Sequence, residues 1–199
     1  MGELALNLTK VSYETYLEVE ENSEEKFEYH DGLILAMAGG TPAHSQLIGN
    51  TAWAVNSALI NQDKPCIFHS SELRLRIEEK NRSFYADGSV FYDEPQSSPV
   101  DKNALINPIL VFEVLSEGTA KFDRGDKFHH YQQIPSLQEY VLVSQTVPMV
   151  ETYFRQEEKG GWFYKKFQGL EEMVRFESIG CEVAMADLYR LVPDLQELD

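Results

Sequence analysis

Two apolar stretches decide the expected fold: residues 84–92 read FYADGSVFY and residues 108–115 read PILVFEVL. Both patterns are typical of strands. Each stretch nevertheless carries one acid, Asp87 in the first and Glu113 in the second. A carboxylate within an apolar strand is costly unless it is paired or binds a metal ion. These two acids therefore mark the candidate site around which we interpret the rest of the chain.

Strand geometry indicates that the two acids can face each other. Side chains alternate along a strand, so each acid shares its face with every second residue, and the carboxylates converge if the two faces coincide. Such a pair suffices for Mg²⁺, which keeps its other positions for water and phosphate oxygens. The alternative is a structural ion pair between a buried acid and a basic residue: Arg74, Arg76 or Lys127.

A polar helix is expected over residues 121–133, before the Ile134-Pro135 pair. Asp123, Lys127 and Tyr131 follow one another at intervals of four, so they line one face of this helix. Taken alone, Asp123 and Lys127 would form an ordinary surface ion pair. Because the helix follows the Glu113 strand, it can pack back across the sheet and bring Lys127 over the two acids.

Residues 26–37 predict a hairpin, since Asp31-Gly32 stands between two apolar-rich arms. Glu28 lies on its first arm. The next helix is expected to begin with Thr41 as N-cap and Pro42 in its first turn. Its buried face is predicted from the spacing of four residues: Ile48, Ala52, Val55 and Leu59. One turn earlier, His44 points inward, either toward the site or merely filling the edge of the core.

The remaining pattern completes a mixed fold. Residues 72–77 alternate strictly and predict a strand with Arg74 and Arg76 on a solvated, basic face. A loop follows at residues 93–101, and a strand at 139–144. Beyond Pro148 the sequence predicts antiparallel β structure, with a hairpin over residues 150–167 that turns at 157–161, and then short strands and a helical turn.

We therefore expect an α/β (α+β) fold in which a central mixed β-sheet is flanked by helices and extended by N-terminal and C-terminal hairpins. At 199 residues the chain is long enough for one well-filled core and short for two, so we expect one domain over residues 1–199. Its core would span about residues 40–145 and its C-terminal extension about residues 148–185.

The formal net charge of -16 opposes non-specific attraction to phosphate backbones. Contact with DNA would therefore need a local basic patch, which we expect from four residues: Arg74, Arg76, Lys121 and Arg124. Two cysteines suit free thiols in a reducing interior. Residues 1–6 lack a basic and apolar leader, so we expect a cytoplasmic protein without membrane contact. The aromatic hairpin at residues 152–167 is the expected surface of a homodimer.

Several motifs resemble those of the Uma-type endonucleases, a family within the PD-(D/E)XK nuclease superfamily that was long catalogued as a domain of unknown function. The matching segments, in chain order, are FEYHDG at 27–32, Ala43-His44, Tyr85-Ala86-Asp87, PILVFEVLS at 108–116, FDRGDKF at 122–128 and LQEY at 137–140. The segments are individually loose, but their order and spacing are specific. They span about residues 12 to 145, most of the chain.

This resemblance implies a restriction-endonuclease-like core with Asp87 and Glu113 as metal ligands. The chain departs from the family pattern at two positions. Ala86 replaces the proline of the aspartate motif, and Leu115 stands where the superfamily lysine would fall. Relatives often supply that lysine from the following helix, which here indicates Lys127.

The leading hypothesis is an endonuclease that hydrolyses DNA with Mg²⁺ or Mn²⁺. Asp87, Glu113 and the Val114 carbonyl would hold the metal ion. Three side chains would assist: Lys127 would stabilise negative charge and place the attacking water, Glu28 would complete the acidic shell, and His44 would orient a water or a ligand. The alternative is a module on a nuclease scaffold that binds nucleic acid or a partner without cutting, which the net charge and Leu115 favour. A third hypothesis is a purely structural acidic protein.

Overall fold

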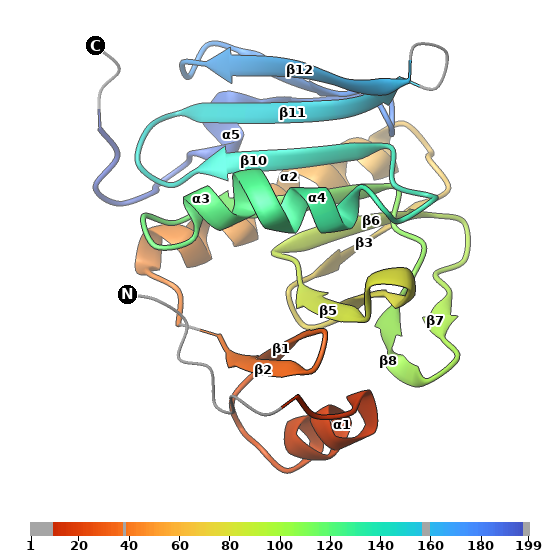
Figure 1. The fold of residues 1–199 in the computed structure, drawn as a ribbon. Helices are drawn as coiled ribbons and strands as arrows, with labels where there is room; N and C mark the ends of the chain where they lie inside the picture. The colour runs from red at the N-terminus through yellow and green to blue at the C-terminus, as the bar shows by residue number, and fades with distance from the viewer. Residues whose placement is uncertain (1–9, 38, 157–159, 197–199) are drawn as a thin grey trace.

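Two six-stranded sheets and one two-stranded sheet make up the β structure of the computed structural model (Figure 1). The structure describes residues 10–37, 39–156 and 160–196. The predicted absence of a leader at residues 1–6 and most of the predicted 157–161 turn therefore lie outside the described residues. None of the described helices combines the length and apolar character that crossing a bilayer requires.

The first sheet joins the N-terminal hairpin to strands from the middle of the chain, in the order β2-β1-β5-β4-β8-β7. Its strands are β1 (Phe27–His30), β2 (Leu33–Ala36), β4 (Arg74–Ile77), β5 (Arg82–Tyr85), β7 (Ser97–Ser98) and β8 (Asp101–Leu105). The predicted hairpin is confirmed, with Asp31 and Gly32 at positive φ in its turn. The segment predicted as a plain loop at residues 93–101 instead contains β7 and the start of β8.

The second sheet has the order β12-β11-β10-β9-β6-β3. Its strands are β3 (Cys66–Ser70), β6 (Gly88–Tyr92), β9 (Leu110–Leu115), β10 (Glu139–Ser144), β11 (Met149–Gln156) and β12 (Gly161–Gln168). Strands β9 and β10 are parallel, whereas the other neighbours are antiparallel. The hairpin β11–β12 continues the sheet of the predicted core, and the interpretation as a single domain stays a prediction.

The mixed α+β class is confirmed, but its strands divide between two sheets rather than forming a single central one. The predicted strand over residues 84–92 breaks at Ala86 and Asp87: β5 ends in the first sheet and β6 begins in the second. Glycine allows this transition, because a Cβ at Gly88 would lie 2.7 Å from the ring of Phe68. Asp87 thus stands at the junction of the two sheets.

Helices cover both faces of the second sheet (Figure 1). Helix α2 (Pro42–Asn61) packs on one face, with β13 (Met173–Phe176), β14 (Cys181–Ala184) and α5 (Met185–Leu188) beside it. Its buried face differs in part from the prediction, since Leu47 and Thr51 are buried where Ile48 and Ala52 are half-buried. Val55 and Leu59 are buried as predicted.

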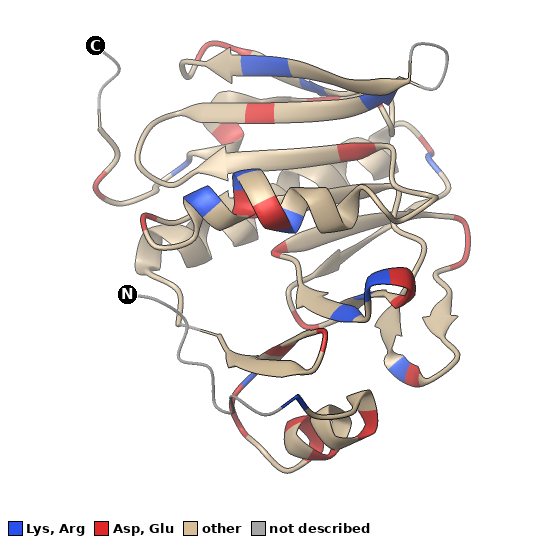
Figure 2. Ribbon diagram, viewed as in Figure 1, with Lys and Arg blue, Asp and Glu red and all other residues tan. Residues whose placement is uncertain are grey.

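The opposite face carries a helical segment over residues 120–131. It consists of α3 (Ala120–Phe122), a π-helical turn (Asp123–Lys127) and α4 (Phe128–Tyr131). The segment predicted as one regular helix therefore has a wider turn at its centre, a feature that is frequent at functional sites. Acidic and basic residues alternate along it (Figure 2), yet Asp123 and Lys127 are buried.

The prediction that Arg74 and Arg76 lie on a solvated face of β4 is wrong. Arg74 and Arg76 are only 8% and 6% exposed, because α1 (Tyr13–Glu21) covers this part of the first sheet. The guanidinium of Arg76 stacks 3.8 Å from the ring centroid of Tyr13. The basic patch expected from Arg74, Arg76, Lys121 and Arg124 is therefore not formed.

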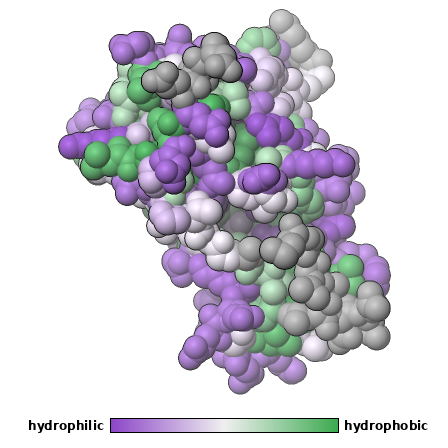
Figure 3. Space-filling model, turned by 90° about the vertical axis from the view of Figure 1, so that its left-hand side faces the viewer, coloured by the Kyte–Doolittle hydropathy of each residue, from purple (hydrophilic) through white to green (hydrophobic). Residues whose placement is uncertain are grey.

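One face of the molecule is largely polar. On the face shown in Figure 3, hydrophilic residues predominate and hydrophobic ones form separate patches. Phe163 and Tyr164, in the aromatic hairpin expected to mediate dimerisation, are exposed, and the dimer stays a prediction. Cys66 and Cys181 are free thiols, as expected.

Candidate active site

Asp87 is held beside Glu113 by the backbone of the neighbouring strand. The β6–β9 register pairs Gly88 with Phe112, so its extension by one residue places Asp87 opposite Glu113. The backbone N–H of Val114 donates a 2.7 Å hydrogen bond to Asp87 Oδ2. The structure therefore brings together the two acids that strand alternation predicted to converge.

Glu113 lies in the middle of β9, where its side chain is only 4% exposed. One of its oxygens, Oε1, accepts two contacts from the helical segment. Lys127 Nζ lies 3.0 Å from it, and the hydroxyl of Tyr131 donates to it at 3.0 Å. The helix face predicted from the spacing of Lys127 and Tyr131 thus packs directly over the buried acid.

Lys127 links the two sheets through its single ammonium group. Besides Glu113, Nζ lies 3.6 Å from Glu28 Oε1 and donates to the carbonyl oxygen of Tyr85 at 3.2 Å. No ion pair between Lys127 and Asp123 occurs among the described residues, so the alternative of an ordinary surface pair is wrong. The other alternative was an ion pair between a buried acid and a basic residue. The structure contains such a pair between Glu113 and Lys127.

Glu28 is buried on β1 and faces the same lysine. Its Oε1 accepts the backbone N–H of Tyr85 at 3.1 Å, and its Oε2 lies 3.2 Å from His30 Nε2. Glu28 is thus anchored by the first sheet while Lys127 reaches it from the helix on the second. The structure places this predicted member of the acidic shell at the site.

His44 approaches the site from the first turn of α2. The Thr41 hydroxyl caps the helix by accepting the His44 backbone N–H at 3.1 Å, as predicted. A Cβ at Gly40 would lie 2.9 Å from His44 Nδ1, so glycine leaves room for the ring. Nε2 of His44 lies 3.2 Å from Asp87 Oδ2, and these two side chains are 20% and 16% exposed. They form the most accessible part of the site.

The cluster holds a surplus of negative charge, with four carboxylates around one lysine: Glu28, Asp87, Glu113 and Asp123. Burial, reinforced by the charges of Asp87 and Asp123, raises the pKa of Glu113 well above its ordinary value. Burial alone would lower the pKa of Lys127, but the charges of Glu113 and Glu28 raise it well above its ordinary value. Lys127 therefore keeps its charge, and a second cation bound beside Glu113 would favour the ionised form of that carboxyl group.

The unused oxygens of this cluster fit a hard metal ion. Asp87 engages its described neighbours through Oδ2 and Glu113 through Oε1, and no described residue forms a hydrogen bond with the second oxygen of either. Within the described ranges, no group of three or more His, Cys, Asp or Glu residues is arranged to hold a metal ion. Two carboxylates and the Val114 carbonyl are instead the sparse ligand set that suits Mg²⁺.

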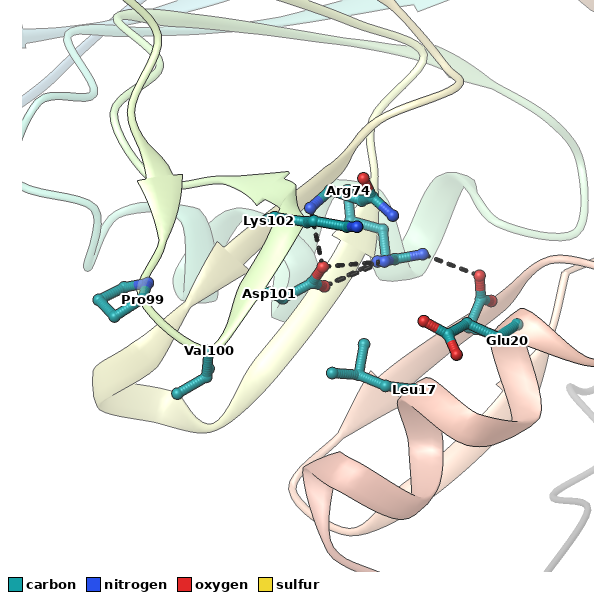
Figure 4. Close-up of a pocket in the computed structure, with 9 residues that line it drawn as sticks. Leu17, Glu20, Arg74, Pro99, Val100, Asp101 and Lys102 are labelled. Carbon is teal, nitrogen blue, oxygen red and sulfur yellow. Dashed lines mark hydrogen bonds and ion pairs between the residues drawn. The ribbon is translucent and has the colours of Figure 1, made fainter.

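A second charged cluster borders a cavity of about 400 Å³ between α1 and the β7–β8 region (Figure 4). Arg74 forms two hydrogen bonds with Asp101, each of 3.1 Å, and donates to Glu20 at 2.9 Å and to the Tyr85 hydroxyl at 3.1 Å. The hydroxyl of Tyr13 donates to Asp101 at 2.8 Å. This cluster is fully paired, which is typical of a structural role.

Sequence reasoning did not identify how the site residues are supported. Tyr131 was placed on the correct helix face, but nothing in the sequence showed that its hydroxyl reaches Glu113. Tyr85 contributes through its backbone N–H and carbonyl, which any residue could supply. His30 contacts Glu28 across an interval of two residues on one strand, and that alternation was the available signal.

Comparison with known proteins places these observations in a family. Residues 13–186 match the family Uma2, described as "Putative restriction endonuclease". Two uncharacterized proteins of Synechocystis sp. (strain ATCC 27184 / PCC 6803 / Kazusa) are similar. One is 35% identical over 184 residues, covering 91% of this chain and 92% of its own length. The other is 34% identical over 161 residues, and the match covers 81% of this chain and 89% of that protein's length.

A crystal structure from Anabaena variabilis ATCC 29413, described as a "putative nuclease belonging to DUF820", shares the fold. It has a TM-score of 0.69 and 20% sequence identity, and the match covers 90% of this chain and 97% of that one. The predicted restriction-endonuclease-like fold class is confirmed at this level.

Proposed function

Because the chain belongs to the Uma2 family ("Putative restriction endonuclease"), we propose that it is an endonuclease that hydrolyses DNA with Mg²⁺ or Mn²⁺. The observation that carries the proposal is the contact of 3.0 Å between Lys127 Nζ and Glu113 Oε1, beside the Asp87 carboxylate fixed by Val114. Two acids and one lysine from separate elements meet at the junction of the two sheets. That set of groups supports metal-assisted phosphodiester hydrolysis.

Asp87, Glu113 and the Val114 carbonyl would hold the metal ion. When bound, the ion supplies a Lewis acid that lowers the pKa of a coordinated water and neutralises phosphate charge. The protein's own contribution is to present both carboxylates at one point. It does so because the donors among the described residues contact one oxygen of each acid and leave the other without a hydrogen bond.

Lys127 would stabilise negative charge that develops on the phosphate and place the attacking water. Its raised pKa keeps the ammonium charged, so it serves as an electrostatic stabiliser rather than as a base. Glu28 and the Tyr85 carbonyl fix its position. The lysine of the superfamily motif, absent at Leu115, would thus be replaced by one that reaches the same carboxylate from the helix.

His44 would orient a water molecule or a substrate group at the accessible edge of the site. Its ring lies next to Asp87, and although burial opposes it, this carboxylate raises the pKa of His44. An imidazole that retains its proton there can donate a hydrogen bond to an incoming oxygen.

A second candidate is a module that binds DNA or a partner without cutting, and the lack of the expected basic patch favours a partner other than DNA. Arg74 and Arg76 are buried, and Arg124 is paired with Glu151. The net charge of -16 then opposes tight binding to nucleic acid.

Cleavage of plasmid DNA with Mg²⁺, Mn²⁺ or a chelator separates the two candidates. We expect wild type to nick the plasmid with either metal and not with the chelator, and Asp87→Asn to be inactive. Arg76→Lys serves as a control for a buried charged position away from the site. Nicking that survives both the chelator and Asp87→Asn would refute the enzyme, and binding without nicking would support the module.

A further inference from the structure

Tyr131 combines complete burial with a hydroxyl aimed at a candidate metal ligand. The side chain is 0% exposed, and its hydroxyl donates to Glu113 Oε1 at 3.0 Å, the same oxygen that Lys127 contacts. We infer that Tyr131 is a positioning residue, which holds Oε1 of Glu113 so that Oε2 is presented to a divalent cation. This inference rests on the proposed function.

Packing fixes the phenol ring of Tyr131, and its hydroxyl donates a single hydrogen bond. Its ring packs against Phe84 and Tyr140, with centroid distances of 5.4 Å and 5.6 Å. A tyrosine hydroxyl is protonated at neutral pH, since its ordinary pKa is about 10. A protonated phenol has a single donor, and its proton points to Glu113.

Lys127 alone would not fix the carboxylate of Glu113. Its ammonium is shared with Glu28 and the Tyr85 carbonyl, and it ends a flexible four-carbon chain. Without Tyr131, the carboxylate can rotate and give either oxygen, or both, to the ammonium. The rigid phenol restricts that rotation, as hydrogen-bonding partners of metal ligands commonly do.

Asp87 shows the same arrangement on the other side of the site. Its Oδ2 accepts the Val114 N–H at 2.7 Å and lies 3.2 Å from His44 Nε2. Each acid therefore has one oxygen held by two neighbours, while no described residue forms a hydrogen bond with its other oxygen. The repetition on two acids from different segments, one in β9 and one at the junction of β5 and β6, indicates that both are oriented for a shared ligand.

Tyr140 provides a matched control. It is also 0% exposed and belongs to the same core cluster, but its hydroxyl donates to the backbone carbonyl of Asp123 at 3.0 Å. Tyr131→Phe and Tyr140→Phe each remove one buried phenol hydroxyl and keep the ring. Only the first removes a donor from Glu113.

The test is titration of the metal-free protein with Mn²⁺ and Mg²⁺ by calorimetry, together with thermal unfolding. We expect Tyr131→Phe to weaken cation binding roughly tenfold and Tyr140→Phe to leave it near wild type, although both lower the melting temperature. Unchanged binding by Tyr131→Phe, or equal weakening in both variants, would overturn the inference while wild-type binding still supports the proposed function. Wild type that binds neither cation would overturn both.

A variant that retains the donor keeps the test decisive if Tyr131→Phe does not fold. Para-aminophenylalanine at position 131 keeps the ring and an N–H donor, so we expect it to bind Mn²⁺ as wild type does. Loss of binding in this folded variant would contradict a role that depends on the donor.

Discussion

Two buried cations, Arg74 and Lys127, occupy similar surroundings but differ in what they leave unpaired. Each meets two carboxylates and lies near a tyrosine hydroxyl. Around Arg74, every oxygen of Asp101 and Glu20 accepts a hydrogen bond. Around Lys127, no described residue forms a hydrogen bond with Glu113 Oε2. A complete set of partners is typical of a structural cluster, whereas a carboxylate oxygen that no described residue contacts is what a ligand site would require.

Tyr85 joins the two clusters. Its hydroxyl accepts from Arg74 and donates to Glu20, while its backbone N–H and carbonyl serve Glu28 and Lys127. The structural cluster therefore fixes one wall of the candidate active site. The contrast between them can be tested by changing one cluster at a time.

The largest expected effect on stability is that of Arg74→Met. This change leaves Asp101 and Glu20 buried without a cation, so the free energy of unfolding should fall by about 3–5 kcal/mol. Lys127→Met should cost less in metal-free buffer, because Glu113, whose pKa is already raised, can take up a proton. Urea denaturation of both variants measures the difference. Equal decreases in the free energy of unfolding for the two variants would contradict the distinction between the two clusters.

Neutralising one acid in each cluster should give effects of opposite sign. Glu113→Gln relieves repulsion with Asp87 and Asp123, so the metal-free protein should be as stable as wild type or more stable by about 1 kcal/mol. Asp101→Asn should destabilise, because it removes an acceptor from Arg74. Mg²⁺ should raise the melting temperature of Asp101→Asn and not that of Glu113→Gln. A large loss of stability in metal-free Glu113→Gln would identify its pair with Lys127 as structural.

A smaller effect concerns the pH dependence of stability without metal. The raised pKa of Glu113 means that the folded state binds more protons, so its contribution to stability declines as pH rises above about 4.5. Burial alone would raise the pKa of Asp101, but its hydrogen bonds with Arg74 lower it. The contribution of Asp101 to stability is therefore lost as pH falls below about 3.8.

Unfolding free energies between pH 3 and pH 8 measure both branches. Glu113→Gln should flatten the decline above about pH 4.5, and Asp101→Asn should flatten the acid branch. Glu139→Gln is the control for the upper branch, because burial raises the pKa of Glu139 to about 7 away from the site. If Glu139→Gln accounts for the whole decline, Glu113 is ionised as freely as an exposed acid.

Local sequence patterns predicted several residues of the candidate site. Asp87 and Glu113 stand out as acids in apolar strands, and the interval of four residues put Lys127 and Tyr131 on one helix face. The break at Asp87 between two sheets was not predictable, because it depends on which distant strands pair with β5 and β6.

The surroundings of Arg74 and Arg76 show the same limit. Alternation in β4 predicted a solvated basic face, but alternation shows only which residues share a side. The cover comes from α1, whose Tyr13 and Glu20 lie more than 50 residues earlier in the chain. Such pairing over long sequence separation is invisible to a local pattern.

The most direct test of the account is a comparison of metal binding and plasmid cleavage in wild type and Lys127→Met. If Lys127 acts on the developing charge, Lys127→Met should nick plasmid roughly 100-fold more slowly while it still binds Mg²⁺ about as tightly as wild type. Arg76→Lys, a change at a buried cation away from the site, should retain cleavage. Full cleavage by Lys127→Met, or cleavage by wild type that does not need a divalent cation, would contradict the claim that this cluster is a metal-dependent nuclease site.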